Sequence, residues 1–287
     1  MITIALPNKG RLSEKALDLF ERAGLRAEFT SERALVAALG NDFRAIFVRA
    51  ADVPEFVADG AADAGVTGWD LIAESGREVE TLLDLGFGRC RLAVAVPEGS
   101  DIASLEDVPG GARIATTFPR LASRFFADAG IAIELAHVSG AAEIAPHLGV
   151  ADGIVDLVST GSTLRVNGLR EVTTVLKSTA RLIASSEAWA DPARRTRLEE
   201  LVAALESVVR AARKRYLMAN VPRDRLDEVK RVLPGINGPT ILEVFDGGRW
   251  VAAHAVVDED RVYQTITALK RLGAEGILVT SIERLMP

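Results

Sequence analysis

The stretch ADGIVDLVSTGSTLR, residues 151–165, joins a hydrophobic run directly to a cluster of hydroxyl groups. Apart from Asp156, residues 154–158 are apolar on both faces of an extended chain, which is typical of a strand buried inside a sheet. The polar residues 159–163 follow at once, and they surround one glycine. A polar loop after a buried strand predicts an α/β fold with a binding site at the end of that strand.

Strand-like and helix-like segments alternate along the first two-thirds of the chain. Strands are expected at residues 2–6, 43–50, 62–68, 90–97, 112–118, 131–138 and 154–158, and helices at 54–60, 70–76, 119–130 and 141–149. A further helix is expected to start with Ser13 as its cap and to end at Gly24. The turn-rich residues 97–111 separate two blocks of this pattern. The alternation predicts two α/β lobes with parallel sheets and a cleft between them.

The pattern changes after Asp191. A long amphipathic helix is expected first, because apolar residues recur at helical spacing from Leu198 to Ala212. Strands are then expected at 216–221, 240–245, 250–257 and 276–282, helices at 223–233 and 259–273, and a turn at Asp246–Arg249. The order strand, helix, strand, strand, helix, strand predicts a ferredoxin-like C-terminal domain.

The composition argues against several classes of protein. The chain has 287 residues and a formal net charge of −6, so a broad basic surface for nucleic acid or acidic membranes is not expected. Cys90 is the single cysteine, which excludes an internal disulfide. Neither a signal peptide nor an apolar run long enough to cross a bilayer is evident. We expect a soluble cytoplasmic protein with no nucleic-acid or membrane partner.

The loop after residues 154–158 is the first candidate site. It consists of Ser159, Thr160, Gly161, Ser162 and Thr163. Consecutive backbone N–H groups at the start of a helix attract an anion, and the hydroxyls add small donors. Asp152 and Asp156 flank the strand and suit the vicinal hydroxyls of a sugar, so a phosphate beside a ribose fits the arrangement. An equally weighted alternative is that the hydroxyls only cap the next helix.

Other expected strand ends carry cations, hydroxyls or glycines. Lys9 and Arg11 follow the first strand and together suit a polyphosphate, whereas either one alone would be read as a solvated charge. The other candidates at strand ends are Arg49, Gly68, Asp70, Arg91 and Thr116. Glu143 is either a helix-start acid or a carboxylate of the site. Several such loops in an acidic chain indicate a cleft for an anionic, nucleotide-like molecule.

Familiar catalytic signatures are missing from the sequence. No P-loop, no glycine-rich dinucleotide fingerprint, no nucleophile elbow and no HExxH zinc motif is present. The three histidines are scattered, and we interpret each as a structural or surface residue.

Seven stretches together resemble one known family. They are NKGRL, GVTGWD, CRLAVAVP, RIATTFP, ADGIVDLVSTGSTLRVNGLREV, PGINGPTI and GAEGILVTSIERL, and the resemblance runs from about Ile2 to Leu285. The chain resembles the long, regulated form of ATP phosphoribosyltransferase, the first enzyme of histidine biosynthesis. The resemblance implies an α/β fold with a two-lobed catalytic region like that of periplasmic binding proteins, followed by a ferredoxin-like, ACT-type regulatory domain. The implied domains are lobe I at 1–90, completed by about 180–213, lobe II at 91–179, and the regulatory domain at 214–287.

The same resemblance implies an activity. The 5-phosphoribosyl group of phosphoribosyl pyrophosphate is transferred to N1 of ATP, and pyrophosphate leaves with Mg²⁺ that is carried largely by substrate phosphates. It assigns catalytic roles to Lys9, Arg11 and Glu143. The ribose and 5′-phosphate would be bound by Asp152, Asp156 and the loop 159–163, and the rest of the shared cleft would include Arg49, Gly68, Asp70, Arg91 and Thr116. Histidine would inhibit through Asn220, Ile236 and Thr240 in a homo-oligomer, either a dimer or a hexamer.

Two other functions are compatible with parts of the pattern. A cytoplasmic small-anion-binding protein of solute-binding fold would have the two lobes but no turnover. An ordinary nucleobase phosphoribosyltransferase would share the hydroxyl-rich phosphate loop but usually lacks the two lobes and the tail.

Overall fold

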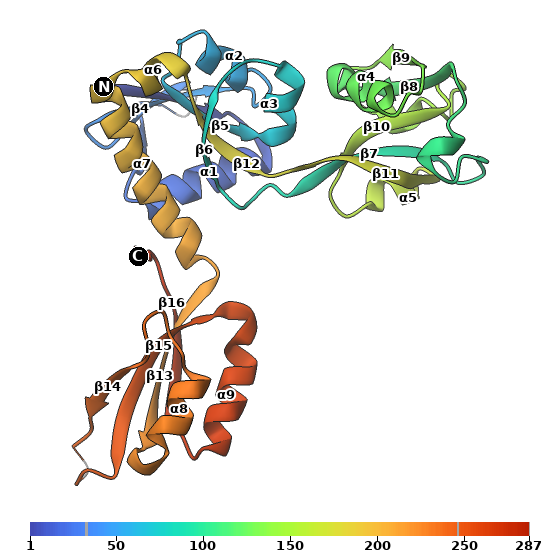
Figure 1. Ribbon diagram of the computed structural model, residues 1–287. Coiled ribbons are helices and arrows are strands. Elements are labelled where there is room, and N and C mark those ends of the chain that lie inside the picture. The colour runs from blue at the N-terminus through green and yellow to red at the C-terminus, as the bar shows by residue number, and fades with distance from the viewer. Residues whose placement is uncertain (32–33, 246, 287) are drawn as a thin grey trace. The chain divides into compact units, whose positions relative to one another are not determined.

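The computed structural model describes residues 1–31, 34–245 and 247–286. By their internal contacts, these residues form two compact units: Met1–Asp18 with Leu25–Val202, and Leu19–Gly24 with Ala203–Pro287. The first unit contains two sheets and the second unit contains one (Figure 1). No described helix is long and apolar enough to cross a membrane.

The first sheet has seven strands in the order β2-β3-β4-β1-β5-β12-β6. Its strands are β1 (Ile2–Pro7), β2 (Ala27–Phe29), β3 (Val36–Leu39), β4 (Phe43–Val48), β5 (Ala64–Gly68), β6 (Glu80–Asp84) and β12 (Ala180–Ala184). The accompanying helices are α1 (Gly10–Arg22), α2 (Val53–Ala58), α3 (Trp69–Ser75), α6 (Ser186–Ala190) and α7 (Pro192–Ala211). Only β1, β4 and β5 pair in parallel, and every residue of β1 is buried. This sheet and its helices form the first lobe.

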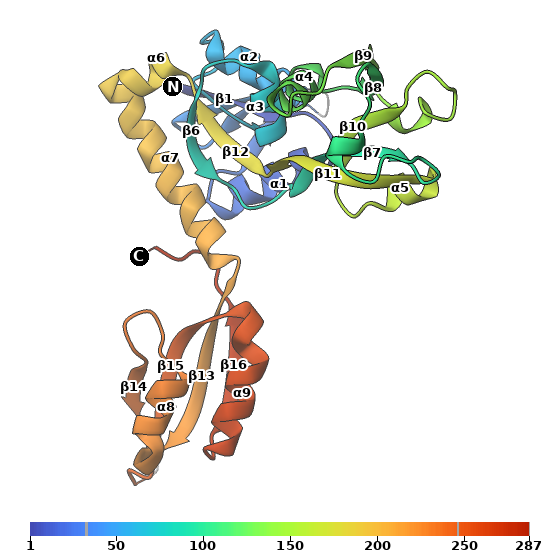
Figure 2. The same ribbon diagram turned by 45° about the vertical axis from the view of Figure 1, so that its right-hand side comes forward.

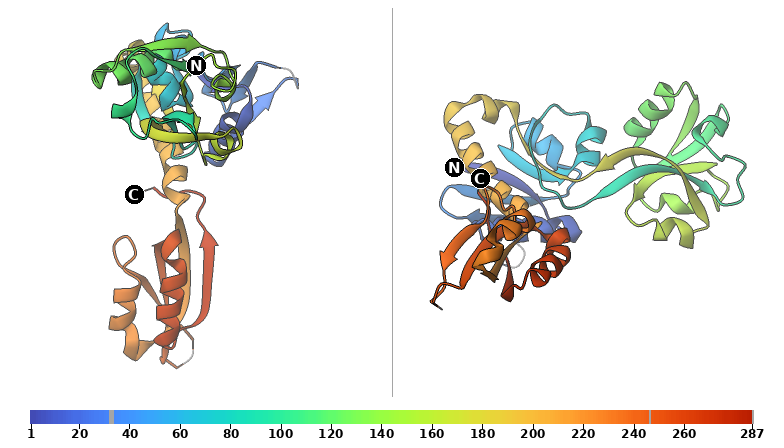
Figure 3. Two further views of the ribbon diagram at one scale, coloured as in Figure 1. Left: turned by 90° about the vertical axis from the view of Figure 1, so that its right-hand side faces the viewer. Right: turned by 60° about the horizontal axis from the view of Figure 1, so that its bottom comes forward.

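The second sheet has five strands in the order β11-β7-β10-β8-β9. Its elements are β7 (Cys90–Pro97), η1 (Leu105–Asp107), β8 (Ala112–Thr116), α4 (Pro119–Asp128), β9 (Ile133–His137), η2 (Ala142–Ile144), β10 (Gly153–Val158), α5 (Ser162–Val166) and β11 (Leu169–Ser178). Consecutive residues of β10 face opposite sides of the sheet. Val155 packs with Phe126 of α4, and Ile154 packs with Leu164 of α5. Figures 1 and 3 show these helices on opposite sides of the sheet. We call this sheet with its helices the second lobe.

The chain passes between the two lobes twice, from β6 to β7 and from β11 to β12. The strands β7 and β11 pair antiparallel over their whole lengths, from Leu169 opposite Pro97 to Ser178 opposite Cys90 (Figure 2). Both connections therefore lie at the same place, next to Cys90 and Ser178.

The α/β fold class is confirmed, but several local expectations were wrong. Both sheets are mixed rather than parallel. In the first sheet, β5 pairs parallel with β1 and antiparallel with β12. In the second sheet, β10 pairs antiparallel with β7 and parallel with β8. Helix α1 begins at Gly10, so Ser13 is a buried residue within the helix and not its cap. The expected helix at 141–149 is only the short turn η2. Five strands were not expected: β2, β3, β6, β11 and β12.

The third sheet has the order β14-β15-β13-β16, and all its neighbouring strands are antiparallel. The chain runs through β13 (Lys214–Pro222), η3 (Arg223–Arg225), α8 (Leu226–Val232), β14 (Thr240–Glu243), β15 (Trp250–Asp258), η4 (Glu259–Arg261), α9 (Val262–Arg271) and β16 (Glu275–Ser281). Val229 of α8 and Leu269 of α9 pack on the same face of the sheet, against Leu217 and Ala253. The ferredoxin-like order is confirmed. Asp246, in the expected turn before β15, lies outside the described residues.

Candidate functional site

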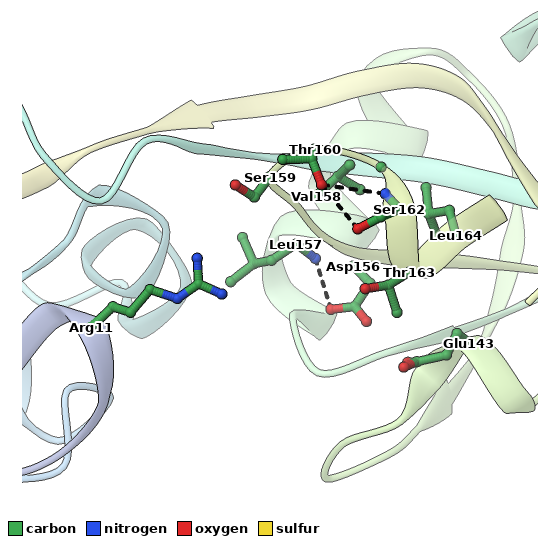
Figure 4. A pocket seen from close by; sticks show the side chains of 11 residues that line it. Arg11, Glu143, Asp156, Leu157, Val158, Ser159, Thr160, Ser162, Thr163 and Leu164 are labelled. Carbon is green, nitrogen blue, oxygen red and sulfur yellow. Dashed lines mark hydrogen bonds between the residues drawn. The ribbon is translucent and has the colours of Figure 1, made fainter. Parts of the chain in front are cut away.

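A cavity of about 190 Å³ lies at the C-terminal end of β10 (Figure 4). It is lined by Arg11, Glu143, Asp156, Leu157, Val158, Ser159, Thr160, Gly161, Ser162, Thr163 and Leu164. Most of these residues belong to the second lobe, and Arg11 of α1 reaches the cavity from the first lobe. Figure 4 shows the Arg11 side chain extended toward Leu157, with the Asp156 and Glu143 carboxyl groups nearby.

The loop at 159–163 takes its shape from Gly161. This residue has φ +77°, a left-handed conformation that side chains with a Cβ rarely adopt. The hydroxyls of Thr160 and Ser162 are 3.0 Å apart, and the Ser162 N–H lies 3.4 Å from the Thr160 hydroxyl. Helix α5 has no side-chain cap hydrogen bond at its N-cap residue, Gly161. Glycine has no side chain to cap the helix, so the Thr160 hydroxyl makes a long bond to a first-turn N–H, and all five loop residues line the cavity.

Two carboxyl groups share the cavity. Burial raises the pKa of Asp156, and the nearby negative charge of Glu143 raises it further, while an N–H donated by Leu157 at 2.7 Å opposes the rise. Glu143 follows Ala141, whose φ is +51°, and it lies in η2. Of the two interpretations of Glu143, the carboxylate of a site agrees with its position in the cavity wall.

Arg91 links the loop 159–163 to Glu171 of β11. Its Nε donates to the Glu171 carboxylate at 2.8 Å, its Nη2 donates to the same group at 2.5 Å, and its Nη1 donates to the Ser159 carbonyl at 3.1 Å. The pKa of Glu171 is lowered, mainly by the hydrogen bonds from Arg91. Arg91 therefore acts on the loop backbone and is not itself in the cavity wall.

Gly68 and Asp70 lie at the start of α3 in the first lobe. Asp70 is 4% exposed, and Ser178 donates its hydroxyl to the Asp70 carboxylate at 2.5 Å. A Cβ at position 68 would clash with that carboxylate, which explains the glycine. Burial raises the pKa of Cys90, and the negative charge of Asp70 adds to the rise. This group lies beside the connections between the lobes and outside the cavity wall.

Four other predicted residues also lie outside the cavity wall. Thr116 is fully buried, and its hydroxyl donates to the Val155 carbonyl at 2.6 Å and accepts from the Phe118 N–H at 2.8 Å. Asp152 precedes β10 and accepts the Arg113 N–H at 2.8 Å, at the opposite end of the strand from Asp156. Lys9 is exposed on the turn before α1, and Arg49 directly follows β4.

The three predicted regulatory residues are spread over the third sheet and the loop after α8. Asn220 is exposed on β13, and Thr240 begins β14 opposite His254. Ile236 is 58% exposed and lines a separate cavity beside α8 and α9. No cavity described in this domain is lined by all three residues.

Two polar partners were missed in the sequence. Glu171 and Ser178 lie 80 and 108 positions from the residues they bind. No local pattern identifies them, because Glu171 meets Arg91 through the pairing of β11 with β7 and Ser178 meets Asp70 through the contact of β11 with α3. Among the described residues, no group of three or more His, Cys, Asp or Glu side chains is arranged to hold a metal ion.

Comparisons with known proteins agree with one another. The family model for ATP phosphoribosyltransferase matches residues 49–207, and the model for the C-terminal domain of the same family matches residues 211–284. An ATP phosphoribosyltransferase of Gemmatimonas aurantiaca is 61% identical, and one of Methanopyrus kandleri is 50% identical, each with both chains covered in full. A chain of the ATP phosphoribosyl transferase (HisG:HisZ) complex from Thermotoga maritima matches with a TM-score of 0.64 and 27% identity. The match covers 73% of the present chain and 99% of that chain.

Proposed function

Since the chain belongs to the ATP phosphoribosyltransferase family, we propose that the cavity at the end of β10 binds phosphoribosyl pyrophosphate. Family membership makes the protein a phosphoribosyltransferase, and the alternative of a binding protein without turnover is not favoured. The observation that carries the proposal is the loop 159–163, where hydroxyls and N–H groups surround the left-handed Gly161 beside a buried strand. Such a loop suits the 5′-phosphate.

The reaction moves one group between two anionic substrates. N1 of adenine forms a bond to the anomeric carbon of the ribose, the bond from that carbon to the pyrophosphate oxygen breaks, and the electron pair leaves with pyrophosphate. Neutral N1 carries no proton, so the step needs alignment and charge compensation more than a general base. In our proposal Asp156 accepts hydrogen bonds from the ribose hydroxyls, and Arg11 balances phosphate charge from the first lobe. Glu143 is the second carboxylate of the site.

Phosphoribosyltransferases typically use a metal ion, and we propose Mg²⁺ here. Asp156, Glu143 and the loop hydroxyls are oxygen donors, the type that Mg²⁺ prefers. With only two carboxyl groups in the cavity wall, the donor set suits an ion that keeps most of its ligands from water and substrate phosphates. Such an ion would neutralise charge on the leaving pyrophosphate.

The predicted residues outside the cavity wall have other roles in this proposal. Arg91 and Asp70 are positioning residues, which act through the Ser159 carbonyl and through Ser178. Asp152 and Thr116 stabilise the pairing around β10. We propose that the cations Lys9 and Arg49 contact the second substrate, ATP.

The tail is proposed to regulate the enzyme. The expected domain boundaries, 1–90 with about 180–213, 91–179 and 214–287, assign regulation to the third sheet. We propose that histidine binds near Asn220, Ile236 and Thr240 and inhibits. We also propose that the chain forms homo-oligomers, a dimer and a hexamer, and that the protein is located in the cytoplasm. The relative from Thermotoga maritima is itself part of a complex. The test is inhibition of the full chain by histidine with and without Asn220→Ala, together with sedimentation in both states.

The assay for the main proposal combines the protein with ATP, phosphoribosyl pyrophosphate and MgCl₂, and follows near-ultraviolet absorbance together with pyrophosphate release. Gly161→Val should abolish most turnover, because a β-branched side chain is strained at φ +77° and would stand beside the phosphate. Gly130→Val is the matched control, since Gly130 has φ +73° in the same lobe and does not line the cavity. Equal loss of activity in both variants would contradict the assignment of the loop.

A further inference from the structure

A second cavity lies within the C-terminal domain, between the end of α8 and the first half of α9. Its volume is about 620 Å³. Its wall includes Lys214, Arg231, Ile236, Asp258, Arg261 and Thr265. Figure 1 shows α8 and α9 beside each other on one face of the sheet. The cavity is therefore formed entirely by elements of one unit.

The wall carries three cations and one carboxylate. Lys214 donates to Asp258 at 2.6 Å, and this bond is the main reason that the pKa of Asp258 is lowered, with Arg261 adding to the effect. Lys214 and Asp258 therefore neutralise each other. The guanidinium groups of Arg231 and Arg261 remain as a net positive charge at the cavity.

Some arginines of the same domain are held by ion pairs. Ion pairs hold Arg215 to Glu259, Arg223 to Glu243 and Arg225 to Glu228. Within the part of the chain that the structure describes, neither Arg231 nor Arg261 forms a salt bridge; Arg231 makes only a long bond of 3.4 Å from Nε to a backbone carbonyl. Two guanidinium groups without a salt-bridge partner thus face one cavity.

A hydroxyl in the wall is also free to bind a ligand. Thr265 of α9 is 8% exposed as a residue, and its side chain makes no hydrogen bond with any residue that the structure describes. Two residues on, Thr267 donates to the Tyr263 carbonyl at 2.9 Å in the usual helical way. The Thr265 hydroxyl is not one of the buried side-chain atoms left without a partner, so it is accessible from the cavity and can donate to an acceptor bound there.

We propose that this cavity binds a phosphoryl group of a small molecule. A phosphoryl group carries about two negative charges and three acceptor oxygens, which match the two guanidinium groups and the Thr265 hydroxyl. The positive end of the dipole of α9, a helix that begins at Val262 beside Arg261, adds to the attraction. The volume exceeds that of a phosphate, which leaves room for an organic part.

The wall favours a phosphoryl group over a free amino acid. An amino acid has an ammonium group as well as a carboxylate, and a second cation beside Arg231 and Arg261 is repelled unless a free carboxylate offsets the charge. The one carboxylate of the wall, Asp258, is already bonded to Lys214. The inference is independent of the ligand proposed for the cavity at the end of β10.

Hydrogen exchange of the full chain, read by mass spectrometry with inorganic pyrophosphate as the probe, tests the proposal at each cavity separately. Pyrophosphate should slow exchange in peptides covering 230–237 and 259–268. In Arg231→Ala and in Arg261→Ala, half of that protection should require a roughly tenfold higher pyrophosphate concentration, as expected for loss of one charge-assisted hydrogen bond. Protection of peptides covering 156–166 should not change in these variants.

Lys230→Ala is the matched control, because Lys230 is the neighbour of Arg231 on α8, carries the same charge and does not line the cavity. Thr265→Val should weaken pyrophosphate binding while leaving the unfolding midpoint without pyrophosphate unchanged or higher. The proposal is overturned if pyrophosphate does not protect 230–237 and 259–268, or if Lys230→Ala weakens protection as much as Arg231→Ala. Protection of 259–268 by histidine but not by pyrophosphate would also overturn it; 230–237 is not used for this comparison, because it contains Ile236 of the proposed histidine site.

Discussion

The Ser178 hydroxyl donates to the Asp70 carboxylate at 2.5 Å, and the Asp70 N–H donates back to the Ser178 oxygen at 3.1 Å. Each of the two residues is 4% exposed. Asp70 begins α3 in the first lobe, and Ser178 ends β11 just before the chain returns from the second lobe. A buried carboxylate in this position ties the first lobe to the strand pair β7 and β11, through which both connections between the lobes run.

Ser178→Ala should destabilise the protein by about 1–3 kcal/mol, because it removes a hydrogen bond to a buried carboxylate and leaves that group without this donor. The measurement is the free energy of unfolding from urea titrations. Ser186→Ala is the control, since that hydroxyl makes only an exposed bond of 3.4 Å to Glu80. Equal stability of the two variants would show that the Asp70 carboxylate does not need Ser178.

Glu171→Gln should weaken the support that Arg91 gives to the Ser159 carbonyl. Because Arg91 lowers the pKa of Glu171 in the folded state, this pair stabilises the protein above the unfolded pKa of about 4.3. The stabilisation is lost as the pH falls through the lowered folded pKa. Wild type should exceed Glu171→Gln by about 1 kcal/mol at neutral pH, since both side chains are partly exposed.

The two unfolding free energies should converge as the pH falls through the lowered pKa of Glu171, where this group takes up its proton. The same variant should raise KM for phosphoribosyl pyrophosphate more than KM for ATP, because the Ser159 carbonyl belongs to the proposed phosphate loop. A stability difference that does not depend on pH would indicate that the charge of Glu171 is not what holds Arg91.

The strand β10 and its loop could be predicted because their signal is local. A buried strand that ends in hydroxyls around Gly161 is visible in a few consecutive residues, and the structure forms a cavity there. The separation of Asp152 from Asp156 was not foreseen. At about 3.3 Å per residue, four positions correspond to roughly 13 Å along the strand, and Asp152 accepts the Arg113 N–H while Asp156 lines the cavity.

Other features depend on tertiary structure and could not be predicted from local patterns. Glu171 reaches Arg91 because β11 pairs with β7, in a register that is shifted twice, and Ser178 reaches Asp70 because β11 contacts α3. The start of α1 at Gly10 was missed because Ser13, a good cap by type, is instead buried within the helix.

Glu143→Gln should move the acid limb of the pH profile to lower pH. Burial is the main cause of the raised pKa of Asp156, and the charge of Glu143 adds to it, so removal of that charge lowers the pKa by a smaller amount than burial raises it. If ionised Asp156 binds the ribose, kcat/KM for phosphoribosyl pyrophosphate falls as pH drops through this pKa. The control is Glu134→Gln, on β9 and outside the cavity wall. Where turnover is too low, the pH dependence of phosphoribosyl pyrophosphate binding provides the same comparison, and an unmoved limb would contradict the coupling.

Arg11→Ala and Lys9→Ala should separate two cations that the sequence treats alike. Both side chains are exposed and follow β1, but only Arg11 lines the cavity, where its guanidinium extends toward the end of β10 (Figure 4). A guanidinium can donate two parallel hydrogen bonds to a phosphate, and the loss of such bonds corresponds to roughly tenfold or more in kcat/KM. Arg11→Ala should therefore reduce kcat/KM for phosphoribosyl pyrophosphate at least tenfold, and Arg11→Lys should restore only part of it because an ammonium lacks the planar fork. Lys9→Ala should have a smaller effect that falls mainly on ATP, and neither change should alter the unfolding midpoint. A larger loss of kcat/KM for Lys9→Ala than for Arg11→Ala would contradict the assignment of Arg11 to the bound phosphoribosyl pyrophosphate.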